Sequence, residues 1–420
     1  MTTSAFWHGF ADMHAVAESK VVIRSGDGVW LEDIDGRRYL DATAALWYCN
    51  VGYGRRAIAD AVAEQLTRLP AYSSFGAYTS EPTLALADRL ASLAPIPNAA
   101  VFLGSGGSDA VDTAAKLVRR YWDVVGRPEK RVIVSREYGY HGMHGWGTSL
   151  VGIGPMKTGY GGAFIDEVVN VGPMDVESLA ALFEVRGSEI AAFIGEPVIG
   201  AGGVVPPEEH YWPEVNRLCR EHDILLIADE VITGFGRTGR LWGTQRYGIE
   251  PDLITFAKGV SSGYVPLGGV LVGERVRAPF WDEDVPGAVF RHGYTYSGHA
   301  GAAAAAMANL DILEGEGLVD RVAALEPVLD RQLRRLEGAP GVGEVRTVGL
   351  TGAVAFAPAL LAADPGLPER AVVAAQRHGV ATRVLRGHAL QVSPPFVITE
   401  AEITMMVDGL GAALDDVARG

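Results

Sequence analysis

A lysine and a pair of acids each follow a short apolar run in the middle of the chain. Lys258 comes after the run 253–257 and precedes a glycine, while Asp229 and Glu230 come after the run 224–228. A lysine in apolar surroundings has its charged form disfavoured, so its amine can attack a carbonyl group. A buried carboxylate needs a cation or several hydrogen-bond donors beside it. The same patterns also fit a lysine that reaches solvent and an acid that caps a loop.

A glycine-rich stretch, residues 104–109, precedes the helical run 110–121. Glycines before a helix let backbone N–H groups approach an anion, and the helix N-terminus adds partial positive charge, so the stretch has the form of a phosphate cradle. It is not a P-loop, because no Gly-Lys-Ser/Thr follows, and Asp109 stands where the third glycine of a dinucleotide fingerprint belongs. A plain tight turn with Ser108 or Asp109 as the helix cap is an equal alternative.

Two further stretches contain aromatic residues between glycines. Tyr140 and His141 lie between Gly139 and Gly142, and a polar, aromatic loop at 292–299 precedes an alanine-rich run. Tyr140 could stack on a flat ligand or be an ordinary core aromatic. Taken together, a phosphate cradle, a stacking aromatic, an acid and a lysine suit pyridoxal 5′-phosphate, whose ring nitrogen the acid would keep protonated and whose aldehyde the lysine would bind as a Schiff base.

The elements around these residues predict an α/β protein. The runs 132–134, 191–194, 224–228 and 253–257 are typical of strands buried on both faces of a parallel sheet, and a helix is expected at 211–222. The N-terminal runs 21–23 and 29–31 predict a meander. Helices are expected at 319–336 and 400–417, with strands at 349–356 and 389–392. We therefore expect a large domain over residues 60–309 and a smaller α+β domain built from residues 1–59 and 310–420.

Composition narrows the function classes. The 420 residues include 36 Lys and Arg against 51 Asp and Glu, a net charge of −15, which argues against nucleic-acid binding. The longest apolar run, 300–308, is shorter than the roughly 20 residues that span a bilayer, and no secretory signal is evident. Cys49 and Cys219 cannot form a disulfide framework or a four-thiolate zinc site. We expect a cytoplasmic enzyme with small-molecule substrates and no metal.

The stretch 227–239, IADEVITGFGRTG, makes a family resemblance specific. From about Leu31 to the C-terminal helix the chain resembles a class III aminotransferase among the fold-type I pyridoxal-phosphate enzymes. That resemblance implies a large domain with a mostly parallel seven-stranded sheet. It also implies a homodimer with shared active sites, or a tetramer.

The resemblance assigns roles to residues of this chain. Lys258 resembles the Schiff-base lysine, which also moves the proton between Cα and the cofactor, and Asp229 resembles the partner of the pyridine nitrogen. The remaining implied cofactor contacts are Gly106, Gly107 and Ser108 at the phosphate, Tyr140 and Val231 on the two ring faces, His141, Glu196, and Thr295, which would reach the phosphate of the neighbouring subunit.

The stretch 46–54, LWYCNVGYG, resembles ω-amino acid and amine:pyruvate transaminases. It implies a substrate pocket lined by Trp47, Phe75 and Tyr140. Ala201 stands where ornithine and γ-aminobutyrate members usually carry a glutamate, so the substrate-binding arginine would lack a fixed partner and could move between a carboxylate and an open position. The spacing to the proline pair 394–395 favours Arg383 for that arginine over Arg386.

The resulting hypothesis is ping-pong transfer of an amino group from an ω-amino acid or amine to a keto acid such as pyruvate. A class III aminomutase or a decarboxylating transaminase would use the same cofactor residues. A nucleotide-dependent oxidoreductase would use the glycine loop but would leave Lys258 unexplained, and a non-catalytic binding protein would not take up the cofactor.

Overall fold

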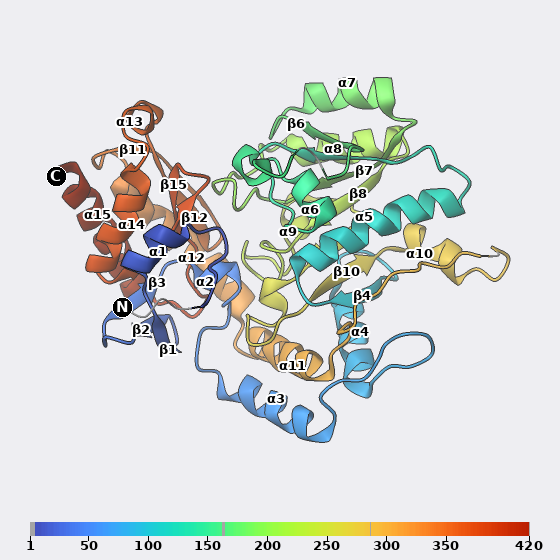
Figure 1. Ribbon diagram of the computed structural model, residues 1–420, viewed down its shortest axis with the longest axis horizontal. Helices are drawn as coiled ribbons and strands as arrows, with labels where there is room; N and C mark the ends of the chain where they lie inside the picture. The colour runs from blue at the N-terminus through green and yellow to red at the C-terminus, as the bar shows by residue number, and fades with distance from the viewer. Residues whose placement is uncertain (1–4, 162–163, 286, 420) are drawn as a thin grey trace.

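A seven-stranded sheet forms the centre of the computed structural model, which describes residues 5–161, 164–285 and 287–419 (Figure 1). Its strand order is β4-β10-β9-β8-β7-β5-β6. Strands β9, β8, β7, β5 and β6 run parallel, and β10 is antiparallel to both β9 and β4. The strands are β4 (Ala100–Gly104), β5 (Val132–Arg136), β6 (Val168–Val171), β7 (Ile190–Gly195), β8 (Leu225–Asp229), β9 (Leu253–Phe256) and β10 (Gly268–Val272). The predicted mostly parallel seven-stranded sheet is therefore confirmed.

Helices cover both faces of this sheet, which explains its nearly continuous apolar strands. Within β8, Leu225 and Ile227 pack into the cluster beneath α5 (Gly107–Val124), whereas Leu226 packs into the opposite cluster beneath α7 (Val176–Arg186) and α8 (Tyr211–Glu221). Helices α6 (Gly145–Leu150) and α10 (Glu274–Trp281) lie on the α5 side. Helices α3 (Arg56–Arg68), α4 (Glu81–Leu93) and α11 (Ala300–Gly315) pack together at the β4 end.

The two ends of the chain meet in a second body, drawn at the left of Figure 1. Strands β1 (Ile23–Asp27), β2 (Trp30–Asp33) and β3 (Arg38–Asp41) form the predicted meander, and β13 (Val380–Ala381) adds to β3 in parallel. A second small sheet has the order β11-β12-β15-β14, from β11 (Val342–Val348), β12 (Thr351–Phe356), β14 (Val384–Leu385) and β15 (Ala389–Val392). The helices of this second body are α1 (Met13–Ser19), α12 (Leu318–Leu333), α13 (Pro358–Ala363), α14 (Leu367–Arg377) and α15 (Glu400–Arg419).

Two details differ from the sequence prediction. Helix α5 begins at Gly107, three residues before the predicted run, and its N-cap is Gly106 without a side-chain cap. The alternative with Ser108 or Asp109 as the cap is therefore wrong; Asp109 instead accepts a hydrogen bond from the Ser105 N–H at 2.7 Å. Strands β4, β6 and β10 of the central sheet, and β11, β13 and β14 of the second body, were not identified from the sequence.

Across the described residues, we find no helix with both the length and the apolar character needed to cross a membrane.

Candidate active site

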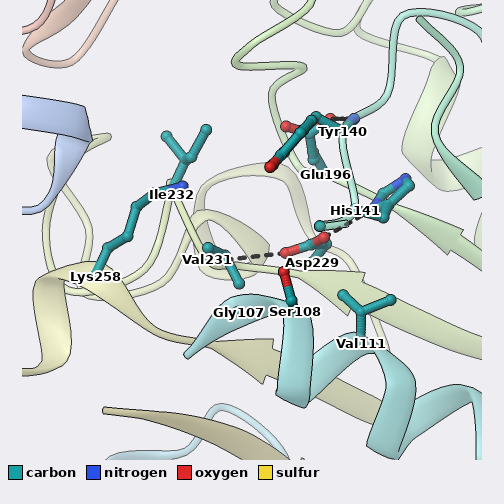
Figure 2. Close-up of a pocket in the computed structure, with 11 residues that line it drawn as sticks. Gly107, Ser108, Val111, Tyr140, His141, Glu196, Asp229, Val231, Ile232 and Lys258 are labelled. Carbon is teal, nitrogen blue, oxygen red and sulfur yellow. Dashed lines mark hydrogen bonds and ion pairs between the residues drawn. The ribbon is translucent and has the colours of Figure 1, made fainter. Parts of the chain in front are cut away.

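A cavity of about 170 Å³ lies where several strands of the central sheet end and α5 begins (Figure 2). Strands β5, β7, β8 and β9 all point their carboxyl ends toward it, the usual place for a ligand in an open α/β sheet. Its lining residues are Gly107, Ser108, Val111, Tyr140, His141, Gly142, Glu196, Asp229, Val231, Ile232 and Lys258. Seven of the predicted cofactor-binding residues are thus brought together with Lys258.

The N-terminus of α5 forms one end of the cavity. The first N–H groups of a helix have no partner within the helix and carry partial positive charge, so they suit an anion. A Cβ on Gly107 would lie 3.0 Å from Val231, and a Cβ on Gly142, whose φ is +86°, would lie 2.6 Å from the Ser108 hydroxyl. The two glycines therefore keep this end narrow but open to a phosphate.

Asp229, the last residue of β8, is held on the cavity floor by two donors. His141 Nδ1 lies 2.7 Å from Oδ2, and the Val231 N–H donates to Oδ1 at 3.2 Å. Both Asp229 and His141 are almost completely buried. The neighbouring acid, Glu230, points elsewhere: it accepts from the N–H groups of Gly243 and Thr244, so it is the loop cap that the pattern also allowed.

Glu196 follows β7 and fastens the loop that carries Tyr140. Its Oε2 accepts the Tyr140 N–H at 3.2 Å, and its Oε1 accepts the Gly200 N–H at 3.0 Å. Burial raises the pKa of Glu196, while His141 acts to lower it. Figure 2 shows Tyr140 beside Glu196, with its hydroxyl directed over the cavity toward Lys258.

Lys258 follows β9, from which Ala257 separates it, and has φ +47° at the start of a short 3-10 turn, Lys258–Val260. A non-glycine residue in this region is strained, and such strain gathers at functional sites. Burial lowers the pKa of Lys258 to about 8, against the opposing effects of Asp229 and Glu196. A large share of this amine is therefore neutral near pH 8.

Trp47 connects Lys258 with Arg383. The lysine Nζ lies 5.6 Å and the Arg383 Cζ 4.5 Å from the Trp47 ring, whose Nε1 donates to Ser393 at 2.9 Å. The segment before Trp47 is kinked, and Ala44, Ala45 and Trp47 all have positive φ.

Arg383 has a side-chain amide as partner but, within the described residues, no acid within ion-pair distance. Its Nε donates to Gln391 Oε1 at 2.6 Å, and burial lowers its pKa to about 10 while Tyr140 opposes that shift. Arg386 is exposed and lies over the Tyr138 ring at 3.6 Å. Of the two candidate arginines, the structure places Arg383 beside Trp47, with electrostatic influence on Lys258.

Six predicted residues do not line this cavity: Trp47 and Arg383, described above, and Ala201, Phe75, Thr295 and Gly106. Ala201 is half-buried against the hydrophobic cluster that contains Trp47. Phe75 and Thr295 are exposed, and Phe75 packs against Gly293 in a separate surface hollow with His292 and Ser297. Gly106 is the N-cap of α5.

Sequence reasoning missed four residues around the site. Val111, Ile232 and Gly142 line the cavity, and Gln391 holds Arg383. Gly142 belonged to the noted Tyr-His stretch, and Val111 and Ile232 lie within motifs that had been singled out. Gln391 had no signal, because its role depends on the β14–β15 hairpin turning it back onto Arg383.

The cavity residues fit pyridoxal phosphate. The α5 N-terminus suits its phosphate, the buried carboxylate of Asp229 suits a protonated ring nitrogen, and the Lys258 amine suits its aldehyde.

Comparison with known proteins shows the family of the chain. The family model "Aminotransferase class-III" matches residues 13–414. The chain is 37% identical to a putrescine–pyruvate aminotransferase of Pseudomonas aeruginosa, covering 94% of this chain and 91% of the relative. It is 36% identical to a β-alanine–pyruvate aminotransferase of the same organism, covering 99% and 96%. It also resembles an amine transaminase crystal structure from an uncultivated Pseudomonas species in the PLP-bound (internal aldimine) form, with 37% identity, TM-score 0.92 and coverage of 98% and 99%.

The fold and the site thus define a pyridoxal-phosphate-dependent enzyme of fold-type I. Within that class the chain belongs to the class III aminotransferases, over nearly its whole length.

Proposed function

We propose that this enzyme transfers an amino group from an ω-amino acid or an amine to a keto acid such as pyruvate, by a ping-pong mechanism. The observation that carries the proposal is that Lys258, Asp229 and the α5 N-terminus surround one cavity. Beside it, Lys258 and Arg383 both lie over the Trp47 ring. The putrescine–pyruvate and β-alanine–pyruvate relatives support the choice of substrates.

Four residues would share the work at the cofactor. Bound pyridoxal phosphate would supply an electron sink for the reaction at the substrate's Cα. Lys258 would hold the cofactor through its aldehyde, and its free amine would take the Cα proton as general base and deliver it to the cofactor as general acid. Asp229 would hold the proton of the ring nitrogen, and Tyr140 and Val231, which line the cavity, would cover the two ring faces.

Arg383 would bind the substrate carboxylate. Its hydrogen bond to neutral Gln391 is weaker than an ion pair, so the guanidinium can leave it for a carboxylate at modest cost. Ala201, in place of a glutamate, leaves the position without a competing acid. An amine without a carboxylate would then occupy the apolar space beside Trp47.

We also propose that two copies of the chain form a dimer with shared sites. Phe75 and Thr295 are exposed and lie apart from the chain's own cavity, although the family resemblance assigns both to an active site. A second subunit would bring Thr295 to the phosphate and Phe75 to the substrate pocket.

The chain is proposed to divide into the domains 1–59 plus 310–420 and 60–309. Pairing of β3 with β13 supports joining the two terminal segments, and both boundaries fall within the mutually packed helices α3 and α11.

A cytoplasmic location is proposed from Cys49 and Cys219, which are buried and free.

An amino-transfer assay tests the proposed function. Putrescine or β-alanine is supplied as donor with pyruvate as acceptor, and alanine is measured. We expect alanine to form in step with loss of donor amine, and Lys258→Ala to abolish multiple turnover. Isomerised donor without alanine would favour an aminomutase, and carbon dioxide release would favour a decarboxylating transaminase.

A further inference from the structure

Arg136, the last residue of β5, is buried beneath the active site and is only 1% exposed. Its guanidinium lies 5.2 Å from the Tyr211 ring and 5.1 Å from the Trp212 ring. Nη2 donates to the main-chain carbonyl of Glu196. Among the described residues, Nε and Nη1 make no hydrogen bond of good geometry, although the Tyr211 hydroxyl is close enough to interact, and no acid forms an ion pair with this arginine.

A buried cation without an ion pair is costly, and an apolar side chain would fill the same space more favourably. The two aromatic rings offset only part of that cost. The positive charge therefore needs another reason, and the neighbouring acids supply one. Glu196 and Asp229 are each 3% exposed, and both lie on the cavity directly beyond this strand end.

We propose that Arg136 is a positioning residue, whose charge keeps the Glu196 side chain ionised so that it can hold the Tyr140 loop against the cofactor ring. This role rests on the proposed function, since it concerns the same cofactor site. Nothing in it requires Arg136 to touch cofactor or substrate.

Two backbone amides depend on the ionised form of Glu196. Its oxygens accept from Tyr140 at 3.2 Å and from Gly200 at 3.0 Å. A protonated carboxyl has one oxygen as a donor, so one of the two amides would lose a good acceptor. Burial raises the pKa of Glu196 above its usual value, and Asp229 adds to that shift; His141, the Gly200 N–H and, to the smallest extent, Arg136 oppose it.

Arg136 also acts on the same loop through its main chain. Its carbonyl accepts the Gly139 N–H at 3.1 Å, one residue before Tyr140. The backbone of Arg136 therefore closes the turn from which Tyr140 leaves, and its guanidinium fixes the end of β7 from which Glu196 leaves. The charge of Arg136 and the turn that its carbonyl closes thus both help to place the Tyr140 ring, which is expected to stack on the cofactor.

The test is designed to separate charge from hydrogen bonding. Arg136→Gln keeps a donor for the Glu196 carbonyl but removes the charge, and Arg136→Lys keeps the charge. Infrared spectroscopy of the cofactor-free chain detects protonated carboxyl groups, and the band that disappears in Glu196→Gln belongs to Glu196. We expect this band to appear at a pH at least one unit higher in Arg136→Gln than in the wild type, and Arg136→Lys to resemble the wild type.

Cofactor binding gives a second readout. We expect the dissociation constant for pyridoxal phosphate to rise about tenfold at pH 7 in Arg136→Gln, but to change much less when Arg136→Gln is added to Glu196→Gln. An unchanged infrared titration in Arg136→Gln, or an equal effect in both backgrounds, would overturn the inference. A wild-type chain that does not bind pyridoxal phosphate would instead contradict the proposed function, while the infrared result would still decide this one.

If the Arg136→Gln chain does not fold, melting temperatures of other variants distinguish a charge role of Arg136 from a packing role. With Glu196 already neutral, the buried cation no longer serves a purpose. Arg136→Met should then leave the melting temperature of the Glu196→Gln chain unchanged or higher. A fall as large as Arg136→Met causes in the wild type would show a packing role only and would overturn the inference.

Discussion

His141 Nδ1 and Asp229 Oδ2 lie 2.7 Å apart, and neither side chain has more than 3% of its surface exposed. With Val231 donating to the other carboxylate oxygen, Asp229 is fixed in orientation by one side chain and one backbone amide. The ring nitrogen of a bound cofactor would therefore meet a carboxylate that cannot rotate away. Fixed charges of this kind stabilise a transition state without reorganisation.

Asp229→Asn should reduce kcat for amino transfer by about 10²–10³-fold, the usual cost of losing one fixed electrostatic partner. An amide of the same shape cannot keep the ring nitrogen protonated. His141→Asn removes only the orienting partner and should cost less. Single-turnover kinetics with a bound amine measures both effects, and equal losses in the two variants would contradict this division of roles.

Arg383→Gln should raise KM for pyruvate by about 10- to 100-fold, since a charge-assisted hydrogen bond contributes roughly 1.5–3 kcal/mol. The rate with a donor amine that lacks a carboxylate should hardly change in the first half-reaction. Arg386→Gln is the matched control, because that side chain is exposed and stacks on Tyr138. If Arg386→Gln shows the larger effect on pyruvate, Arg386 is the carboxylate-binding residue.

The lowered pKa of Lys258, about 8, predicts the pH dependence of cofactor uptake. Only the neutral amine attacks an aldehyde, so the uptake rate of the cofactor-free chain should rise with pH through about 8 and then level off. A lysine with the ordinary pKa of about 10.4 would still be accelerating at pH 9. Stopped-flow absorbance between pH 6 and 10 measures the midpoint, and a midpoint near 10 would refute a desolvated lysine.

The same shift has a consequence for stability. Because the folded chain holds Lys258 at a lower pKa than the unfolded chain, folding is penalised when the amine must be protonated. The penalty is absent above the unfolded pKa, grows as pH falls toward 8, and is constant below it. Lys258→Met should therefore stabilise the cofactor-free protein at pH 7, by about 1–3 kcal/mol, and this gain should vanish near pH 11. Urea unfolding at the two pH values tests this, and destabilisation at pH 7 would count against it.

Shared sites predict complementation between two defective chains. Thr295→Glu would place a negative charge beside the phosphate of the partner's site, and Lys258→Ala disables the chain's own site. A heterodimer of these two chains has one site with both defects and one intact site, so about half of the wild-type activity should return. If Thr295 served its own chain, both sites would be defective and mixing would restore nothing.

The sequence predicted the reactive groups better than it predicted the residues and strands that hold them in place. Lys258 and Asp229 were visible because each ends a buried apolar run, a position set by local pattern. Strand β10 was missed because Gly268 and Gly269 weaken its strand signal, although their lack of side chains lets Gly106 and Phe256 approach. Gln391 and Arg136 could not be assigned, because their partners come from distant segments that only the tertiary fold brings near.

The pairing of Leu40 in β3 with Val380 in β13 also bears on how the protein is made. During translation, β13 cannot add to the N-terminal meander until residue 380 has been made, after every strand of the central sheet. The hydrogen bond from Trp47 to Ser393 must also form late, because Ser393 is made after β13. The substrate side of the pocket should thus form only after the strands of the central sheet have been made.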